Sequence, residues 1–187
     1  SDVCSSDLGQ MAVTADKTYL QMKMLNTAKG PGVQSLRGQA DKIKYPRYMQ
    51  KILKEQENLD IVEGMVEDLI VEDNTVKGVI LDDGQKIMGK MVILTTGTYL
   101  KAEILCGHQK HPSGPDQQKE SKYLSTRLAK LGFRIQRLKT GTPPRVDINS
   151  VDYSKTTLQP GTDAKLAFSF RTKEYVPIDQ QVPCYLT

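Results

Sequence analysis

The sequence lacks any apolar run close to the roughly 20 residues that a helix needs to cross a bilayer, which argues against a membrane-spanning role. It also lacks a strong charge of one sign, because 26 Lys and Arg residues face 22 Asp and Glu residues. The net charge of +4 is too small to indicate a dedicated nucleic-acid-binding protein, although a local basic face remains possible. The hydrophobic content of 38% is typical of a globular protein with a core.

Cysteine is scarce, and its spacing excludes two kinds of site. Cys4, Cys106 and Cys184 are odd in number, lie far apart and form no CxxC pair, so neither a disulfide framework nor a zinc site is indicated. This usage favours a reducing, cytoplasmic setting. His108 and His111 lie in a polar segment without other metal-ligating residues, and we predict a solvated loop there and no metal.

The phosphate-binding fingerprint of dinucleotide-binding folds is also missing. No GxGxxG follows an early strand, and no acidic residue follows such a motif about 20 residues later, so this chain alone is not expected to build a complete dinucleotide site. Residues 1–8, "SDVCSSDL", have neither the features of a signal peptide nor a pattern that leads into the following segment. We interpret them as a non-native leader.

The first third of the chain predicts helices around a glycine-rich break. Residues 16–42 are polar and basic, and the "KGPG" stretch at 29–32 predicts a loop, with a helix restarting near Val33. Pro46 is expected near the start of a further helix over residues 46–59.

From Asp60 the pattern changes to short β-branched runs separated by turns at residues 73–74, 82–84 and 89–90. This predicts a strand, a small antiparallel meander and a buried strand ending at Thr95. A polar loop over 107–120 and a helix over 121–133 should follow, with Ser121 as N-cap and Gly132 as terminator. Further strands are expected over 134–139 and 166–170.

The stretch "VILTTGTYL" at 92–100 is the first candidate site. Gly97 would let a large ligand approach the backbone closely, and the hydroxyls of Thr95 and Thr96 could donate hydrogen bonds to it. A helix beginning at Ser121 would offer amide groups to a phosphate. The alternatives are a turn that contacts no ligand and a serine that only caps its helix.

Several longer stretches carry a family resemblance. "KMLNTAKGPGVQSLRGQADK", "VEDLIVEDNTVKGVILDDG", "VILTTGTYLKAEILCG", "LKTGTPPRVD" and "VPCYLT" resemble the tRNA uridine 5-carboxymethylaminomethyl modification enzymes, the MnmG or GidA family. The resemblance extends from Gly9 to Thr187.

The resemblance implies an α/β, Rossmann-like FAD/NAD(P)-binding flavoprotein fold with an antiparallel β-meander. It also implies FAD, NADH as reductant, methylene-tetrahydrofolate as carbon donor, and a partner GTPase, MnmE. Together they would build an aminomethyl-type group at C5 of the wobble uridine of certain tRNAs, in a protein that usually forms a homodimer. Residues 9–138 would be part of the FAD-binding domain and residues 139–187 the start of an inserted, NADH-associated domain. We therefore expect an internal fragment that is inactive alone.

Individual site residues follow from the same resemblance. Val66 and Ser121 match family contacts to FAD, and Thr96 and Gly97 are placed near the cofactor by the Thr-Gly turn. Three basic residues in the distinctive blocks are candidates for binding RNA or phosphate: Lys29, Arg37 and Arg145. Cys106 and Cys184 are interpreted as small hydrophobic residues, and no catalytic residue is predicted.

Three alternatives remain open. One is the folate- and FAD-dependent tRNA uridine methyltransferase family, which shares the flavin fold but does not explain the block at 26–42. Another is a fragment that binds RNA or protein without performing chemistry. The third is a general NAD(P)H:flavin oxidoreductase, which would leave "KTGTPPR" unexplained.

Overall fold

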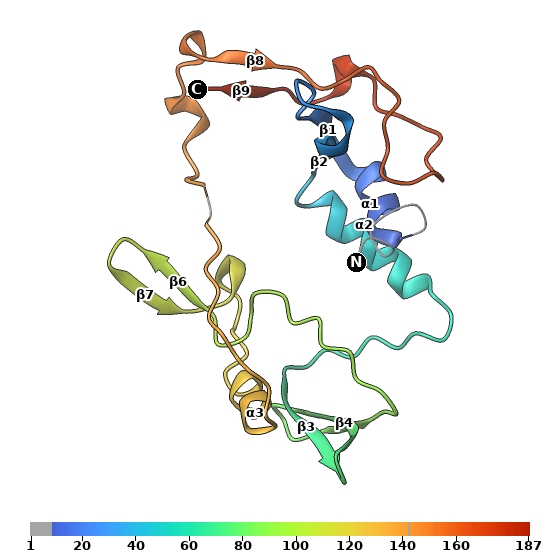
Figure 1. Cartoon of the computed structure of the whole chain (residues 1–187), viewed down its shortest axis with the longest axis vertical. Coiled ribbons are helices and arrows are strands. Elements are labelled where there is room, and N and C mark those ends of the chain that lie inside the picture. Colours follow the sequence, from blue (N-terminus) through green and yellow to red (C-terminus); the bar gives the residue numbers. More distant parts are fainter. Residues whose placement is uncertain (1–8, 142) are drawn as a thin grey trace. The chain divides into compact units, whose positions relative to one another are not determined.

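The structure is a computed structural model that describes residues 9–141 and 143–187. These residues form two compact units (Figure 1). The first unit contains the chain up to Ile61 together with Pro144–Thr187, and the second is Val62–Pro143. The proposed leader, Cys4 and Thr142 of the "KTGTPPR" block lie outside the described residues. The expected domain boundary at 138/139 concerns the parent enzyme and stays a prediction.

The first unit combines two helices with two pairs of strands. Its elements are α1 (Gln10–Thr18), β1 (Tyr19–Leu25), η2 (Pro31–Val33), β2 (Ser35–Ala40), α2 (Lys44–Glu55), η4 (Ile148–Ser150), η5 (Tyr153–Lys155), β8 (Thr157–Gln159), η6 (Ile178–Gln180) and β9 (Cys184–Leu186). Strands β1 and β2 form one antiparallel pair, and β8 and β9 form another. The predicted helix around Pro46 is confirmed as α2.

Helix α2 begins after a capping turn made by Asp41. The Asp41 carboxylate accepts hydrogen bonds from the backbone amides of Lys44 at 2.9 Å and Ile43 at 2.8 Å. These two bonds hold the pKa of the Asp41 carboxyl below its ordinary value. The side chain thereby satisfies amide groups that the first helical turn leaves without a partner.

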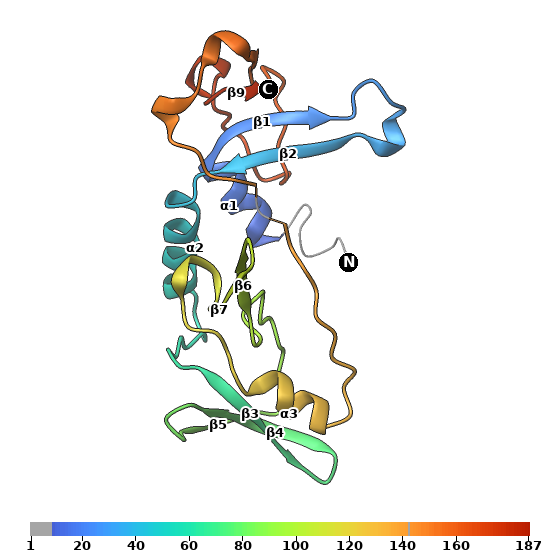
Figure 2. The same ribbon diagram turned by 90° about the vertical axis from the view of Figure 1, so that its left-hand side faces the viewer.

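The prediction of a helix restarting near Val33 is wrong. Residues 35–40 are strand β2, which pairs with β1 in a hairpin whose turn contains the "KGPG" stretch (Figure 2). The strand pattern of β1 depends on distant partners, because Gln21 donates to the carbonyl of Gln159 and the amide of Met22 donates to Gln181. Residues 20–24 of β1 alternate between apolar and polar side chains, so a local strand signal is present there, whereas the run Arg37, Gly38 and Gln39 in β2 has none.

Buried polar groups form the centre of the first unit. The Asp16 carboxylate, 4% exposed, accepts hydrogen bonds from the amides of Phe168 and Ser169 and from the hydroxyl of Thr172. The strand predicted over 166–170 is absent, because this segment turns around Asp16 and its amides donate to that carboxylate. The segment is therefore ordered by a distant acidic residue and not by a neighbouring strand.

The second unit is built from hairpins and one helix. Its elements are β3 (Val66–Glu72), β4 (Thr75–Leu81), β5 (Lys86–Met88), β6 (Glu103–Cys106), β7 (Gln109–Pro112), η3 (Pro115–Gln117) and α3 (Leu124–Lys130). Strands β3, β4 and β5 pair in that order and are antiparallel, which confirms the predicted meander (Figure 2). Hairpin β6–β7 replaces part of the polar loop that was predicted over 107–120.

Two predicted strands of the second unit are not formed. Residues 92–95 and 134–139 have no ladder, and the side chains of Ile93 and Leu138 are 86% and 90% exposed. Neither segment has a hydrogen-bonded neighbour strand among the described residues, so a β-like sequence alone does not make a strand here.

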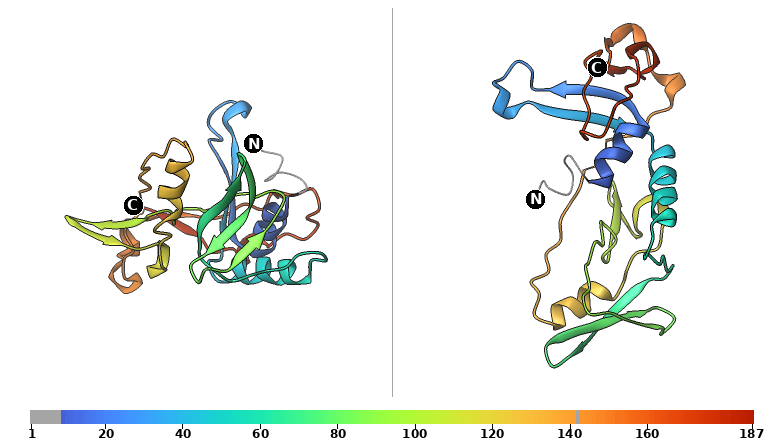
Figure 3. Two further views of the ribbon diagram at one scale, coloured as in Figure 1. Left: turned by 90° about the horizontal axis from the view of Figure 1, so that it is seen from below. Right: turned by 90° about the vertical axis from the view of Figure 1, so that its right-hand side faces the viewer.

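Helix α3 is shorter than predicted and does not begin at Ser121. Its first residue is Leu124, and no side chain caps its N-terminus. Leu124 and Leu128 are buried as expected, whereas Leu131 is 44% exposed. Gly132 adopts φ +93° directly after the helix, as a left-handed terminator should. The helix itself is the yellow one beside the green strands of the meander in Figure 3. Among the described residues, no helix is long and apolar enough to cross a membrane.

Candidate functional site

Ser121 lies at the centre of the candidate site in the second unit. Its backbone amide donates to the carbonyl of Tyr99 at 3.0 Å, and its own carbonyl accepts from the amide of Lys101 at 2.7 Å. These bonds form a parallel bridge between Leu100 and Ser121. Ser121 is 5% exposed, and the predicted role as N-cap is wrong because the segment is held as a strand-like bridge.

The hydroxyl of Ser121 reaches the first strand of the meander. Its Oγ donates to the carbonyl oxygen of Val66 at 3.4 Å, a long hydrogen bond. Val66 is the first residue of β3 and lies opposite Leu81. Two residues that are 55 positions apart and were both predicted to bind the cofactor are thus brought together.

The Thr-Gly turn joins the same group through Tyr99. Gly97 has φ +54°, a left-handed conformation that favours glycine, and the amide of Tyr99 donates to the carbonyl of Thr96 at 3.3 Å. Thr96 is half-buried and Gly97 is exposed. Because Tyr99 pairs with Ser121, the turn, Ser121 and Val66 form one continuous structure.

Tyr99 was missed by sequence reasoning. Its hydroxyl donates to Gln118 Oε1 at 2.6 Å, and its ring covers Gly114, where an added Cβ would lie 2.6 Å from the ring. The ring therefore fixes the turn against the loop after β7. A Thr-Gly turn followed directly by an aromatic residue, with a Gly-Pro pair downstream, is the signal that could have revealed this contact.

An ion pair lies beside this site. Lys119 Nζ and Asp82 Oδ2 are 2.9 Å apart, and the amide of Asp82 donates to the carbonyl of Met65, next to Val66. The hydrogen bond from Lys119 lowers the pKa of Asp82, and the same bond raises the pKa of Lys119. Both side chains are ionised at neutral pH, so the site carries a compensated pair of charges.

The three predicted basic residues lie in the first unit. Lys29 is exposed in the turn of the β1–β2 hairpin, where its amide donates to the carbonyl of Asn26. Arg37 lies in β2 directly opposite Lys23 of β1, and its guanidinium is 3.9 Å from Cys184 Sγ. Arg145 is exposed in the irregular segment before η4. They belong to different segments of the unit, and none lies in the Val66–Ser121 site.

Cys184 has polar surroundings, unlike the buried apolar environment that was predicted. Its Sγ lies 3.0 Å from Gln39 Oε1 and 3.4 Å from Gln21 Oε1, and the side chain is half-buried. Cys106 is exposed in β6. Within residues 9–141 and 143–187, no three His, Cys, Asp or Glu side chains gather in a way that could hold a metal ion.

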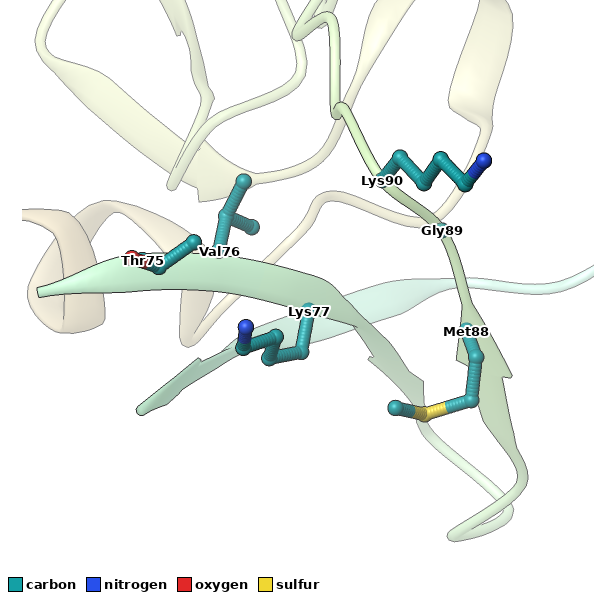
Figure 4. Close-up of a pocket in the computed structure, with 6 residues that line it drawn as sticks. All are labelled: Thr75, Val76, Lys77, Met88, Gly89 and Lys90. Atoms are coloured by element: carbon teal, nitrogen blue, oxygen red, sulfur yellow. The ribbon is translucent and has the colours of Figure 1, made fainter. Parts of the chain in front are cut away.

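An open hollow lies where β4 and β5 diverge (Figure 4). Its lining residues are Thr75, Val76, Lys77, Met88, Gly89 and Lys90. No predicted site residue is among them, so the hollow adds nothing to the site around Ser121.

Comparison with known proteins gives consistent matches. The model of the family described as "Glucose inhibited division protein A" matches residues 4–187. A Geobacillus kaustophilus protein named "tRNA uridine 5-carboxymethylaminomethyl modification enzyme MnmG" is 53% identical over 96% of this chain and 28% of its own length. The protein of the same name from Geobacillus thermodenitrificans is 51% identical over the same shares.

A solved structure gives the same answer for the fold. Aquifex aeolicus GidA matches with a TM-score of 0.86 and 41% identity, over 95% of this chain and 30% of that protein's chain. The match confirms the predicted fold class, with its mixture of helices and antiparallel strands. The chain spans less than a third of the length of these relatives. It belongs to the glucose inhibited division protein A family, GidA, whose curated members here carry the name MnmG.

Proposed function

We propose that this chain is the part of an FAD-dependent tRNA-modifying enzyme that holds one side of the flavin cofactor. The observation that carries the proposal is the hydrogen bond from Ser121 Oγ to the carbonyl of Val66, because it gathers the residues expected to contact FAD. The left-handed backbone at Gly97 is joined to the same group through Tyr99. A backbone carbonyl at a strand end and an exposed glycine turn suit an adenine edge and a closely approaching cofactor.

The reaction proposed for the whole enzyme is the formation of an aminomethyl-type group at C5 of a tRNA wobble uridine. FAD would carry the redox chemistry when bound, NADH would reduce it, and methylene-tetrahydrofolate would supply the carbon. A partner GTPase, MnmE, and a second copy of the enzyme would complete a cytoplasmic assembly. Support comes from family membership and from the names of relatives that are about half identical to this chain.

The first unit is proposed to contact tRNA. Lys23 and Arg37 face each other across β1 and β2, and like charges in that position are unfavourable unless an anion is present. Lys29 extends the same basic hairpin toward its turn. A polyanionic backbone would relieve the repulsion between Lys23 and Arg37, and Arg145 is a further candidate for a phosphate contact.

Cofactor binding is tested in a chimera, because this chain lacks the phosphate-binding fingerprint of a complete dinucleotide site. Residues 9–187 replace the matching segment of the Geobacillus kaustophilus relative, unbound FAD is removed by gel filtration, and the flavin absorbance is recorded. Retained colour is expected, and it should decrease in Gly97→Ala because the left-handed backbone disfavours a Cβ by about 1–2 kcal/mol. Gly107→Ala is the matched control, since Gly107 has φ +58° with open space around it in the β6–β7 turn. A folded but colourless chimera, or equal loss in both variants, would contradict a flavin contact at Gly97.

The reaction is tested with the chimera in which residues 9–187 replace the matching segment of the Geobacillus kaustophilus relative. The chimera is produced in cells that lack their own enzyme, and the tRNA of these cells is analysed by mass spectrometry. Restored aminomethyl-type uridine is expected. A product that is only 5-methyluridine would instead favour the methyltransferase alternative, and unmodified tRNA from a folded, flavin-loaded chimera would oppose the proposal.

A further inference from the structure

Phe170 is exposed in a turn and directly follows a buried residue. The Phe170 side chain is 86% exposed, whereas Ser169 before it is 3% exposed. Phe168 points the other way and packs on β2, where a Cβ added to Gly38 would lie 2.8 Å from its ring. The ring of Phe168 is therefore half-buried against β2, whereas the ring of Phe170, two residues later, faces solvent.

The backbone of this turn is held by the buried carboxylate of Asp16. One Asp16 oxygen accepts from the amide of Phe168 at 2.9 Å, and the other accepts from the amide of Ser169 at 2.9 Å and the hydroxyl of Thr172 at 2.6 Å. The turn is closed by a hydrogen bond from the amide of Thr172 to the carbonyl of Ser169 at 3.1 Å. Hydrogen bonds before and after Phe170 thus fix the backbone that carries the exposed ring.

The charges around the ring are mainly positive. The exposed basic side chains of the segment 161–175 are Lys165, Arg171 and Lys173. None of the three forms an ion pair with another described residue, whereas the acidic Glu174 is already paired with Lys17 at 2.9 Å. Asp163 is a second exposed acid of the segment, seven residues before Phe170, whereas Arg171 directly follows the ring. Arg171 and Lys173 are therefore available to an external anion.

Phe170 has no exposed apolar neighbour in its own segment. Within residues 160–175, Phe170 is the only large hydrophobic side chain that is exposed. A protein-binding surface usually has a core of several apolar side chains, whereas single-stranded nucleic acid is bound by separate aromatic rings between cations. The single ring and its basic neighbours favour nucleic acid.

We propose that the turn at residues 168–172 binds single-stranded RNA, with one base stacked on the Phe170 ring and the adjacent phosphates held by Arg171 and the neighbouring lysines. The choice of RNA over DNA rests on the proposed tRNA-modifying function. Stacking on an aromatic face is largely independent of sequence, so the turn would contribute affinity and position and not base identity.

A fluorescence experiment can locate the contact, because the chain contains no tryptophan. Phe170→Trp introduces a single tryptophan at the turn, which is excited selectively over the eight tyrosines. Titration with a uridine-rich single-stranded RNA of about ten nucleotides should quench its emission by stacking. The matched control is Phe133→Trp, which places a fluorophore at an exposed phenylalanine of the other unit. Its emission should not respond to RNA.

Affinity measurements separate stacking from simple apolar contact. Phe170→Ala should weaken binding of the same RNA by about 5- to 100-fold, with unchanged thermal unfolding because the ring is exposed. Phe170→Leu keeps an apolar side chain without an aromatic face and should also weaken binding, whereas Phe170→Tyr should restore it. Arg171→Gln should lower the dependence of log affinity on log salt by about one unit.

Three results would overturn the inference. One is RNA binding that is unchanged in Phe170→Ala and produces no quenching in Phe170→Trp. Another is a blue shift of the emission maximum of Phe170→Trp as the protein concentration rises. Such a shift would mean that another protein chain covers the ring. The third is a folded chain that binds no RNA at all. Flavin retention and the chimera's product are measured independently, so each outcome is distinguishable from failure of the proposed function.

Discussion

The two compact units are stabilised in different ways. The first unit joins segments more than 130 residues apart through buried polar side chains, such as Asp16 with Ser169 and Gln21 with Gln159. The second is one continuous stretch in which α3, with its buried Leu124 and Leu128, packs against strand β3 of the meander. A buried polar contact fixes geometry strongly because losing one partner leaves the other unsatisfied, whereas apolar contacts tolerate small shifts.

The largest predicted effect is on the first unit, from Asp16→Ala. The substitution leaves the amides of Phe168 and Ser169 and the hydroxyl of Thr172 without their acceptor. We expect the free energy of unfolding to fall by about 4 kcal/mol, because each buried donor left unpaired costs about 1–3 kcal/mol. Urea unfolding gives the total, and hydrogen exchange should show faster exchange at residues 168–169.

The control for this change is Asp163→Ala, which removes an exposed aspartate from the same unit. Asp16→Asn should lie between the two, since an amide oxygen keeps one acceptor but loses the charge. Loss of amide protection in the meander at 66–81 to the same extent would contradict the contrast, because it would show that both units depend on this carboxylate.

A medium effect is predicted for the second unit from Leu128→Ala. Leu128 is 6% exposed, and truncating a buried leucine removes apolar contacts and leaves a cavity. We expect a loss of about 2–3 kcal/mol in the free energy of unfolding, at the low end of the range for core leucines because the core is small. Amide exchange should rise in α3 and β3 while the amides of Phe168 and Ser169 stay protected.

Leu131→Ala is the matched control, because Leu131 lies one turn further along and is 44% exposed. It should change the unfolding midpoint only slightly. Equal destabilisation by the two variants would mean that α3 is not anchored by the Leu128 side of the helix.

The sequence predicted the second unit better than the first, for a physical reason. The meander has local turns and alternating β-branched residues, and Gly132 has a conformational role that is visible in its neighbours. The turn around Asp16 depends on a partner far along the chain, which no local pattern encodes. Hairpin β1–β2 is local, but the polar, glycine-containing sequence of β2 carries no strand pattern. The predicted strand over residues 92–95 is absent for a different reason. Its sequence is typical of a strand, but the described residues contain no neighbouring strand with which it could pair.

The structure brings together three residues of the predicted cofactor site, in a geometry that differs from the expected one. The sequence identified Val66, Gly97 and Ser121, yet it assigned Ser121 to a helix cap that does not exist. Ser121 acts through both backbone groups and its hydroxyl, and its partners Tyr99 and Val66 are 22 and 55 residues away. The importance of Tyr99 depends on a ring packed over Gly114, a contact that only three-dimensional folding creates.

The smallest predicted effect concerns the exposed ion pair between Asp82 and Lys119. The pKa of Asp82 is lower in the folded protein than in the unfolded chain, so the pair stabilises the fold at pH values above the unfolded-state pKa of Asp82. This contribution is lost as the pH falls through the folded-state pKa. The pKa of Lys119 is higher in the folded protein than in the unfolded chain, so its contribution to stability is complete at pH values below the unfolded-state pKa. The contribution is lost as the pH rises through the folded-state pKa. Stability from the pair should therefore be constant around neutral pH and decline at both extremes.

A double-mutant cycle isolates this contribution. Asp82→Asn, Lys119→Gln and the double variant are unfolded in urea at pH 7 and at pH 3, with low and high salt. A small coupling is expected at pH 7 that is smaller at pH 3, where protonation of Asp82 sets in, and that shrinks in high salt, because both side chains are exposed to solvent and ions. A coupling as large as the effect of Leu128→Ala would contradict the comparison, since it would place an electrostatic contact on a level with the leucines that hold the second unit together.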